Sequence, residues 1–246
     1  MNKHYLPRQY RLMKQLIRKL CSFCTRIKEE QRLKKLRRRN SIELYPPDLG
    51  KIKIRIKGSN NVVRIGKLGA VPGRIDIRIC GDNNEVTLGT GLQVSQFLNI
   101  AIGADCANFG AVSKVKVSVG DGTGFESTKL QTYNSNSSIT IGDGCMFSFG
   151  IQVYNTDAHA ILDAQTGTVI NKVRNLTIGN HVWVGANVTI MKNVTIADDC
   201  VIGWGSVVSG KFTEPNCILA GNPARIIKQG ITWEANGARC GYIANE

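Results

Sequence analysis

A histidine stands where a regular pattern of aliphatic residues is interrupted. The segment "YNTDAHAILDAQTGTVINKVR", residues 154–174, follows a run in which an apolar residue recurs at every sixth place, and the place after Val153 holds His159. The pattern does not resume until Ile178. A neutral imidazole near pH 7 can take the proton of a hydroxyl group and so activate the oxygen for attack. His159 is therefore the candidate general base.

A carboxylate that accepts a hydrogen bond from the other ring nitrogen would fix the tautomer of such a histidine and favour its protonated form. Asp157 and Asp163 lie close enough in sequence to be candidates. His181 follows Gly-Asn at a turn position of the pattern, and His4 lies in a basic segment. We expect a structural role for His181 and no catalytic role for His4.

The elements that position His159 follow from a period of six. Residues 178–213 divide into six blocks, and the first residue of each is Ile178, Val184, Ile190, Ile196, Ile202 or Val208. The fifth residue of each block is small or apolar. An amphipathic helix would place apolar residues three and four apart, and a single strand would alternate. A strict period of six instead predicts short strands joined by turns and stacked as coils. The pattern continues upstream with slips, so a β-solenoid is expected over most of residues 50–213.

The cysteines fit the interior of such a solenoid. Cys106, Cys145 and Cys200 each lie four places after an aliphatic residue that opens a block, and we interpret them as small apolar fillers. Cys21 and Cys24 form a CxxC pair without a second pair to complete a zinc site. The chain shows no secretory signal, so reduced cysteines and a cytoplasmic location are expected.

Charge is concentrated at the N-terminus. Of 32 Lys and Arg residues in the 246-residue chain, 14 lie within residues 1–39, which hold only two acidic residues. Residues 8–39 contain no Gly or Pro and space apolar side chains three or four apart, which predicts an amphipathic helix. Three roles for this arm remain open: capping the first coil or bundling within an oligomer, contact with an anionic membrane surface, and nucleic-acid binding. Because the rest of the chain is nearly neutral, nucleic acid is the weakest of the three, and no nucleic-acid partner is expected.

The expected organisation has three parts. A basic helical arm occupies residues 1–40, and a solenoid occupies residues 41–228 with a loop at 154–175. A C-terminal tail occupies residues 229–246. No run of eighteen apolar residues is present, so no membrane-spanning helix is expected.

Three segments resemble the hexapeptide-repeat acyltransferases. They are "NTDAHAILD" at 155–163, "IGNHVWVGANVTIMKNVTIADDCVIGWGSVV" at 178–208 and "ILAGNPARII" at 218–227. The resemblance implies an all-β fold, a left-handed parallel β-helix, which assembles as a homotrimer with active sites between subunits. It also implies acetyl-CoA as donor, a hydroxyl or amino acceptor, His159 as the catalytic histidine and Asp157 as its favoured partner. The short N-terminal and C-terminal extensions favour the branch that O-acetylates sugars, including enzymes of surface polysaccharide biosynthesis. Membrane contact through residues 8–39 would place such an enzyme at the inner face of the membrane.

The resemblance also assigns a groove for the donor along the last coils. Backbone amides there can bind the pantetheine arm, and Lys211 and Arg225 can meet CoA phosphates. Coil packing and turn formation are the alternative explanation for these positions. The large ring of Trp204 stands where the family more often has a small residue. The expected donor-binding residues are Trp183, Gly185, Gly203, Trp204, Gly205, Ser206, Lys211, Asn222, Pro223, Ala224 and Arg225.

A solenoid can also serve functions other than acyl transfer. A γ-type carbonic anhydrase needs three histidines at a metal site shared between subunits, whereas only His159 and His181 lie in the repeat, so no metal is expected. A non-catalytic scaffold or binding module gives no reason for a histidine at the interruption. N-acetylation of an amino sugar stays open, because a general base serves an amine as well as a hydroxyl.

Overall fold

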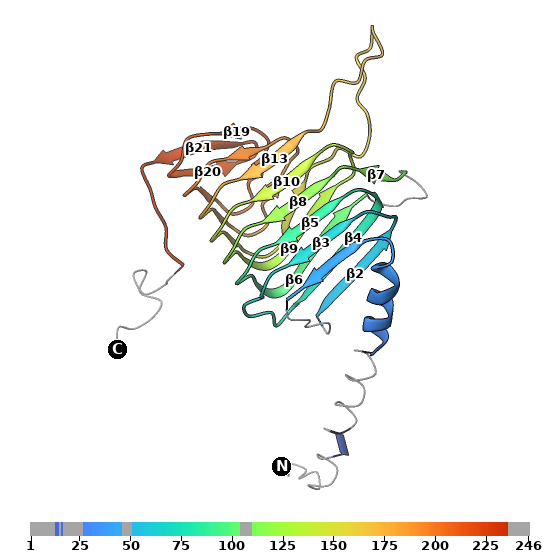
Figure 1. Cartoon of the computed structure of the whole chain (residues 1–246). Coiled ribbons are helices and arrows are strands. Elements are labelled where there is room, and N and C mark those ends of the chain that lie inside the picture. The colour runs from blue at the N-terminus through green and yellow to red at the C-terminus, as the bar shows by residue number, and fades with distance from the viewer. Residues whose placement is uncertain (1–12, 15, 17–26, 46–50, 104–109, 236–246) are drawn as a thin grey trace, which may run out of the picture.

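The computed structural model describes residues 13–14, 16, 27–45, 51–103 and 110–235. The chain winds through parallel strands that stack coil upon coil, with a short helix at one end and a long loop that projects from one edge of the stack (Figure 1). The predicted β-solenoid is confirmed as a stack of parallel strands. Residues 155–174 form a loop between two strands.

One face of the stack is an eight-stranded parallel sheet. Each of its strands comes from a successive coil, and neighbours pair residue by residue, as Ile139 does with Leu176. The strands in order are β1 (Ser41–Leu44), β3 (Val62–Ile65), β5 (Glu85–Leu88), β8 (Lys116–Val119), β10 (Ser138–Ile141), β13 (Asn175–Ile178), β16 (Thr195–Ile196) and β19 (Lys211–Phe212).

The rest of each coil belongs to a thirteen-stranded sheet. In the first coils one long strand covers this side: β2 (Ile52–Lys57), β4 (Arg74–Asp82), β6 (Gln93–Ile102) and β9 (Gly124–Thr132). Because β9 pairs with two later strands, the sheet divides after it into two faces. One face continues through β11 (Met146–Phe147), β14 (Trp183–Val184), β17 (Val201–Ile202), β20 (Cys217–Gly221) and the antiparallel β21 (Ala224–Gln229). The other continues through β12 (Ile151–Tyr154), β15 (Thr189–Ile190) and β18 (Val207–Val208), while the short β7 (Val112–Ser113) pairs with β4.

Three faces meet at three corners, which we name by their residues. The loop corner comprises the turns that precede strands of the eight-stranded sheet, including residues 60–61, 83–84, 114–115 and 155–174. The His181 corner comprises the turns after those strands, including 179–182 and 197–200. The Trp204 corner lies between the other two faces and includes 148–150, 185–188 and 203–206.

The six-residue pattern fills the interior. All six residues that open the blocks of 178–213 are buried, as are Val182, Val188, Val194, Cys200 and Ser206 in fifth places. The prediction that Cys145 and Cys200 are interior fillers is confirmed, since both are buried free thiols. Burial raises the pKa of the Cys145 thiol to about 11, so this thiol is uncharged at neutral pH. Cys21, Cys24 and Cys106 lie outside the described residues.

The expectation that the cysteines are reduced is wrong for Cys80, which is disulfide-bonded; its partner lies outside the described residues. Successive coils stack about 5 Å apart. Stacking can make residues that are distant in sequence into neighbours, so the scatter of the cysteines along the sequence did not exclude a disulfide.

The N-terminal helix covers the first coil. Residues 27–36 are helical, Leu33 is part of the buried core, and Leu36 packs against it. A guanidinium nitrogen of Arg32 donates to the backbone oxygen of Ile54 in β2. These contacts agree with the capping role among those considered for the arm, because an uncovered first coil would expose its apolar interior and unpaired strand edge. Leu12, Leu20 and Phe23 lie outside the described residues, and no described helix is long and apolar enough to cross a bilayer.

A ladder of buried asparagines fixes the loop corner in the first coils. The Asn61 side chain donates to Asn40 Oδ1 at 3.0 Å and to the Gly81 oxygen at 2.9 Å. Its own Oδ1 accepts from the backbone and side-chain nitrogens of Asn84, each at 3.0 Å. The amide therefore satisfies groups of three coils at once, and it is fully buried.

Asn61→Ala is expected to lower the free energy of unfolding by about 2–4 kcal/mol, because it leaves several buried polar groups without partners. Urea denaturation monitored by circular dichroism measures the change. The control is Asn136→Gly, at an exposed position with φ of 58° where Gly is tolerated. Equal stability of the Asn61 variant and the control would contradict this account of the corner.

Candidate active site

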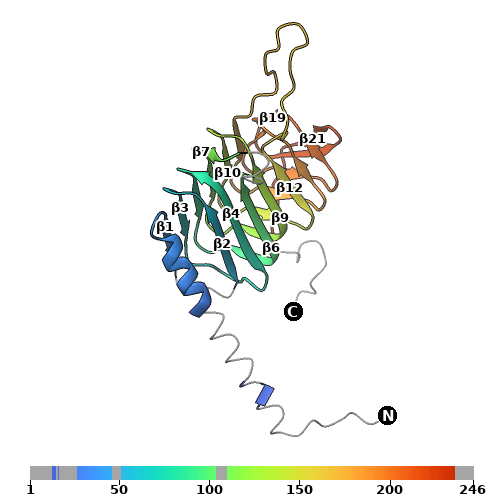
Figure 2. The ribbon, with the colours of Figure 1, turned by 90° about the vertical axis from the view of Figure 1, so that its right-hand side faces the viewer.

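The loop of residues 155–174 leaves the stack after β12 and returns at β13. It projects far from the body of the molecule in both views (Figures 1 and 2). An antiparallel bridge between Leu162 and Val169 joins its two arms, and Ile161 and Ile170 are exposed beside it. The loop is thus a narrow two-stranded arm with apolar flanks.

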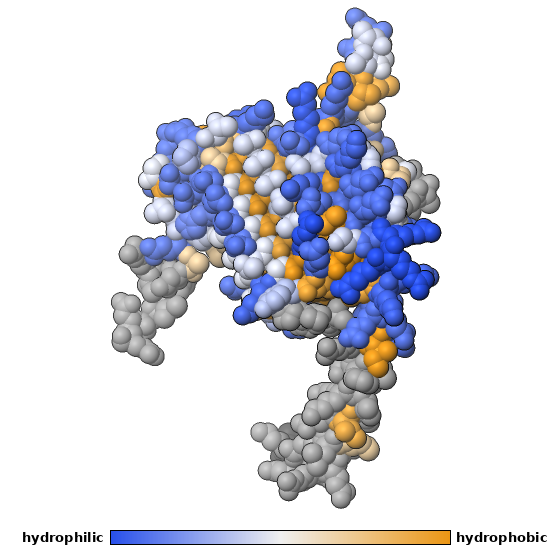
Figure 3. Space-filling model, viewed as in Figure 1, coloured by the Kyte–Doolittle hydropathy of each residue, from blue (hydrophilic) through white to orange (hydrophobic). Residues whose placement is uncertain are grey.

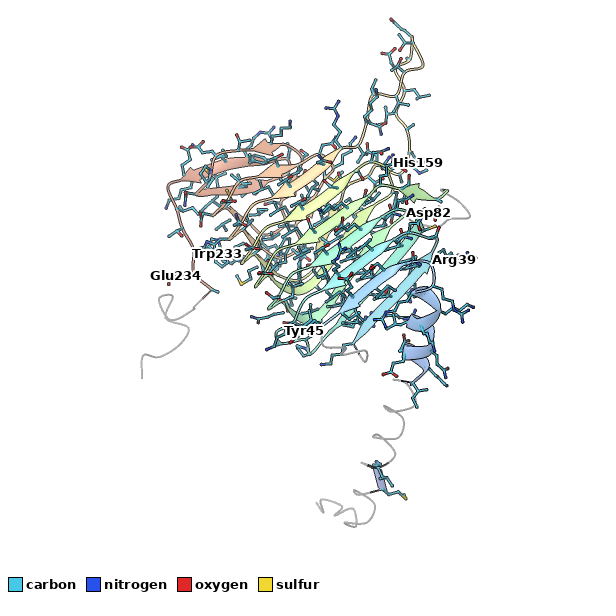
Figure 4. All side chains as sticks on the ribbon, in the orientation of Figure 1. Arg39, Tyr45, Asp82, His159, Trp233 and Glu234 are labelled. Carbon is cyan, nitrogen blue, oxygen red and sulfur yellow. The ribbon has the colours of Figure 1, made fainter. Side chains whose placement is uncertain are left out.

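His159 lies at the base of this arm, close to the stack (Figure 4). Ala158 takes a left-handed conformation with φ of 61°, and the His159 backbone nitrogen donates to the Asp157 oxygen at 2.7 Å. This tight turn directs His159, which is exposed, to a cavity of about 480 Å³. Asp157 and Asn171 also line the cavity. A histidine beside an open cavity is accessible to a substrate.

Asp157 holds the base of the loop together. Its carboxylate accepts from Asn171 Nδ2 at 2.7 Å and forms an ion pair with Lys192 from the turn of the next coil. Asn171 Nδ2 also donates to the His159 backbone oxygen at 2.9 Å. These contacts attach both arms of the loop to the stack. That Asp157 also orients the imidazole of His159 stays a prediction.

Asp163 has a different task at the tip. Its carboxylate accepts from the backbone nitrogens of Gln165 and Thr166 and from the Thr166 hydroxyl. These hydrogen bonds hold the pKa of the Asp163 carboxyl below its usual value. The carboxylate therefore stabilises a turn in the projecting arm.

His181 is held in a structural arrangement at its own corner. Its Nδ1 lies 2.8 Å from Asp199 Oδ1, and its ring stacks on Trp233 with centroids 4.2 Å apart. Trp233 Nε1 donates to the His181 backbone oxygen at 2.8 Å. His181 therefore fastens the segment after β21 to the stack, which agrees with the structural role expected for it. Neither Asp199 nor Trp233 was predicted as a partner of His181 from the sequence, although Asp199 lies 18 residues after His181, or three periods of six.

Most expected donor-binding residues gather at the Trp204 corner. Gly185 donates its backbone hydrogen to the Ile202 oxygen, and Gly203 donates to the Leu219 oxygen, so the turns that contain them stack. Trp204 is 67% exposed and meets Phe149 edge to face, with centroids 5.2 Å apart. Phe149 was not predicted at this site from the sequence. Phe149 lies at the same corner as Trp204, two coils earlier, and this spacing was the sequence signal that could have predicted the contact.

Several residues in that set already have packing roles. Ser206 is buried, donates to the Gly203 oxygen at 2.6 Å and accepts from the Gly221 backbone nitrogen at 3.2 Å. A Cβ on Gly185 would lie 2.7 Å from the Ile202 oxygen, so only Gly permits this stacking distance. The exposed residues of the set are Trp183, Trp204, Gly205, Lys211, Asn222, Pro223 and Arg225, whereas Ala224 is buried.

One chain does not bring the two halves of the expected site together. His159 lies at the loop corner, whereas Trp204 and the cis Asn222–Pro223 turn belong to the Trp204 corner. Lys211 opens β19 at the loop corner, away from the other expected donor residues. No group of three metal-ligating side chains is found among the described residues.

The six-residue pattern matches a known family. Residues 175–210 match the bacterial transferase hexapeptide family, which is described as six repeats. Residues 175–210 therefore carry this repeat. The match covers the coils that follow the loop, where β13 to β18 are stacked.

Relatives of this repeat chain include named acetyltransferases. It is 32% identical over 102 residues to a polysialic acid O-acetyltransferase of Neisseria meningitidis, a match covering 42% of this chain and 47% of the relative. A polysialic acid O-acetyltransferase of Escherichia coli is 34% identical over 112 residues, covering 46% of this chain and 34% of the relative. These matches thus span less than half the length of either curated relative. The crystal structure of the polySia specific acetyltransferase NeuO aligns with a TM-score of 0.59 and 27% identity, covering 76% of this chain and 90% of that one.

Lys192→Met should loosen the base of the loop, because the Asp157 carboxylate loses its cation and the Asn171 oxygen loses a donor at 3.2 Å. We expect backbone amides in residues 158–172 to exchange hydrogen roughly 5–10-fold faster, which corresponds to about 1 kcal/mol of lost local stability. Lys172→Met is the matched control, since Lys172 is exposed and forms no salt bridge among the described residues. Unchanged exchange in the Lys192 variant would show that other contacts fix the loop.

Proposed function

We propose that this protein is an acetyl-CoA-dependent O-acetyltransferase that acts on a sugar hydroxyl, with His159 as general base. The observation that carries the proposal is an exposed histidine beside a cavity at the base of the loop that interrupts the hexapeptide pattern. Similarity to acetyltransferases of polysaccharides supports the reaction and the acceptor class. We propose that the protein acts in surface polysaccharide biosynthesis.

The proposed reaction needs one base and one proton path. The imidazole of His159 takes the proton of the acceptor hydroxyl while the hydroxyl oxygen bonds to the thioester carbon. Collapse of the tetrahedral intermediate breaks the carbon–sulfur bond, and the protonated imidazole returns its proton to the departing thiolate of CoA. Asp157 is proposed to act by fixing the loop base, through Asn171 and Lys192, so that the imidazole meets the acceptor in one orientation.

The donor is proposed to bind at the Trp204 corner. Its exposed Trp204 ring offers an apolar face to the adenine or the pantetheine arm, and Arg225 offers an exposed guanidinium to a phosphate. The site accepts acetyl-CoA without a metal in this proposal.

A second subunit would complete the site. Because His159 and the Trp204 corner lie on different corners of one chain, the donor corner of a neighbouring subunit must approach the loop of the first. The exposed apolar side chains of the loop arm, among them Ile161 and Ile170, would be covered by such a neighbour. We therefore propose a homotrimer of left-handed coils, as the family resemblance implies. A cytoplasmic location is part of this proposal.

The test measures the release of the CoA thiol from acetyl-CoA in the presence of different acceptors. The acceptors are sugars, amino sugars, nucleotide sugars and polysialic acid. His159→Ala is expected to lower kcat about 10²–10⁴-fold, the usual contribution of a general base. Calorimetry should show that this variant binds acetyl-CoA as the wild type does.

The control is His181→Asn, which changes the other histidine of the repeat and should keep most of the activity. Full activity of His159→Ala would reject His159 as the base, and release with amino sugars alone would change the proposal to N-acetylation. Failure of the wild-type protein to bind acetyl-CoA would favour the scaffold or binding module.

A further inference from the structure

We infer that the loop corner is an extended binding surface for an acidic polysaccharide, with a remote anchoring site at Arg38 and Arg39. This inference rests on the proposed function and adds to it the charge class of the acceptor and the path along which the acceptor lies. The surface is defined by the exposed basic residues Arg37, Arg38, Arg39, Lys57, Lys114, Lys172 and Arg174.

The corner is continuous from the first coil to the loop. Asn40, Asn61 and Asn84 follow one another in the buried ladder, and the Val115 backbone nitrogen donates to Asn84 Oδ1 at 3.0 Å. The Lys116 nitrogen then donates to the Ser137 oxygen in the coil before the loop. With about 4.8 Å between neighbouring strands, the five steps from Asn40 to Asn155 span about 24 Å. Arg39, Asp82 and His159 accordingly lie along one edge of the stack in Figure 4.

The far end of this edge is a basic hollow. Arg37, Arg38 and Arg39 line a shallow cavity of about 370 Å³, together with Asn60 and Asn61. No salt bridge between described residues involves any of these arginines, although Arg37 Nε donates to the Ile42 oxygen at 3.0 Å. Figure 3 shows strongly hydrophilic residues gathered at this edge, over the N-terminal helix. Guanidinium groups that are free of protein carboxylates can bind carboxylates of a ligand in a bidentate manner.

The middle and upper parts of the edge remain basic. Lys114 is exposed in a left-handed turn with φ of 56°, in the same place of its coil as Asn60 and Asn83. Lys172 and Arg174 are exposed where the loop rejoins the stack. The opposing acids among the described residues of the corner are Asp82, which accepts from the Ser59 backbone and hydroxyl, Asp157, which is paired with Lys192, and Asp163, which accepts hydrogen bonds within the loop arm. Glu85, which begins β5 beside the corner, is paired with Arg64 and lies 4.0 Å from Lys116. The exposed charge along the edge is thus mainly positive.

The shape of this surface favours a carbohydrate polymer. Its basic residues form a line that leads to the cavity of His159, whereas a membrane would need them spread over one end of the molecule. Single-stranded nucleic acid is bound largely through stacking on aromatic side chains. The large exposed aromatic residues among the described ones are Tyr45, Phe149, Trp183 and Trp204, and they belong to the other two corners. A flexible chain of acidic sugars could place one sugar at His159 while carboxylates further along meet Arg38 and Arg39.

The experiment measures binding of fluorescently labelled polysialic acid to the full-length protein by anisotropy, with long chains compared with the dimer. Arg38→Glu/Arg39→Glu is expected to weaken binding of long chains about 5–20-fold, since each reversed charge removes one exposed contact and adds a repulsion. Binding of the dimer should not change, because a dimer at His159 cannot reach the arginines. Affinity for long chains should also fall steeply as salt is raised.

The matched control is Lys67→Glu, which changes an exposed lysine after β3, at the His181 corner, and should leave binding of long chains unchanged. Equal affinity of the wild type for long chains and dimer, or equal losses for Lys67→Glu and the arginine variant, would overturn the inference. Loss of binding to phosphatidylserine vesicles, with unchanged binding of the polymer, would assign the arginines to a membrane surface instead. His159→Ala should bind long chains normally, so the binding result is independent of whether His159 acts as a base.

Discussion

Stacking of one coil on the next is the constraint on which the rest of this structure depends. Each strand satisfies its backbone hydrogen bonds only through the coils before and after it, and each aliphatic side chain at the opening of a block is buried only because its neighbours repeat it. A residue placed at a corner in one coil is therefore held at a fixed distance from the same place in the next. The faces between the corners are rigid, so side chains at a corner can be held in the fixed positions that a functional site requires.

The loop corner shows how the chain uses this rigidity. Asn155 at its start donates to the Ser138 and Arg174 oxygens, so both ends of the loop are tied to the stack while its arm projects into solvent. The Asn193 backbone nitrogen donates to Asn155 Oδ1 at 3.2 Å and connects the loop to the coil that follows. Asp157, Asn171 and Lys192 then fasten the segment that contains His159. These contacts fix the position of His159 within the loop that interrupts the repeat.

The period of six predicted the stack, its buried residues and the place of the loop, because each coil repeats the same steric demand. It did not predict the partners of Asp157, since Lys192 and Asn171 become neighbours only when the loop is folded back on the next coil. The disulfide of Cys80, the stacking of His181 on Trp233 and the contact of Phe149 with Trp204 were missed for the same reason. Such contacts join residues that folding brings together from separate segments of the chain. The six-residue period predicts which residues are buried within a coil, but it does not predict which side chains meet in this way.

The pH dependence of kcat/KM for acetyl transfer tests the central claim most directly. If His159 is the general base, kcat/KM of the wild-type protein should rise with pH through the range in which an imidazole titrates and then level off. The residual reaction of His159→Ala should lack that inflection, while its affinity for acetyl-CoA is unchanged. An inflection of the same size and position in the variant would show that another group takes the proton, and the account of the loop corner as the catalytic site would then be contradicted.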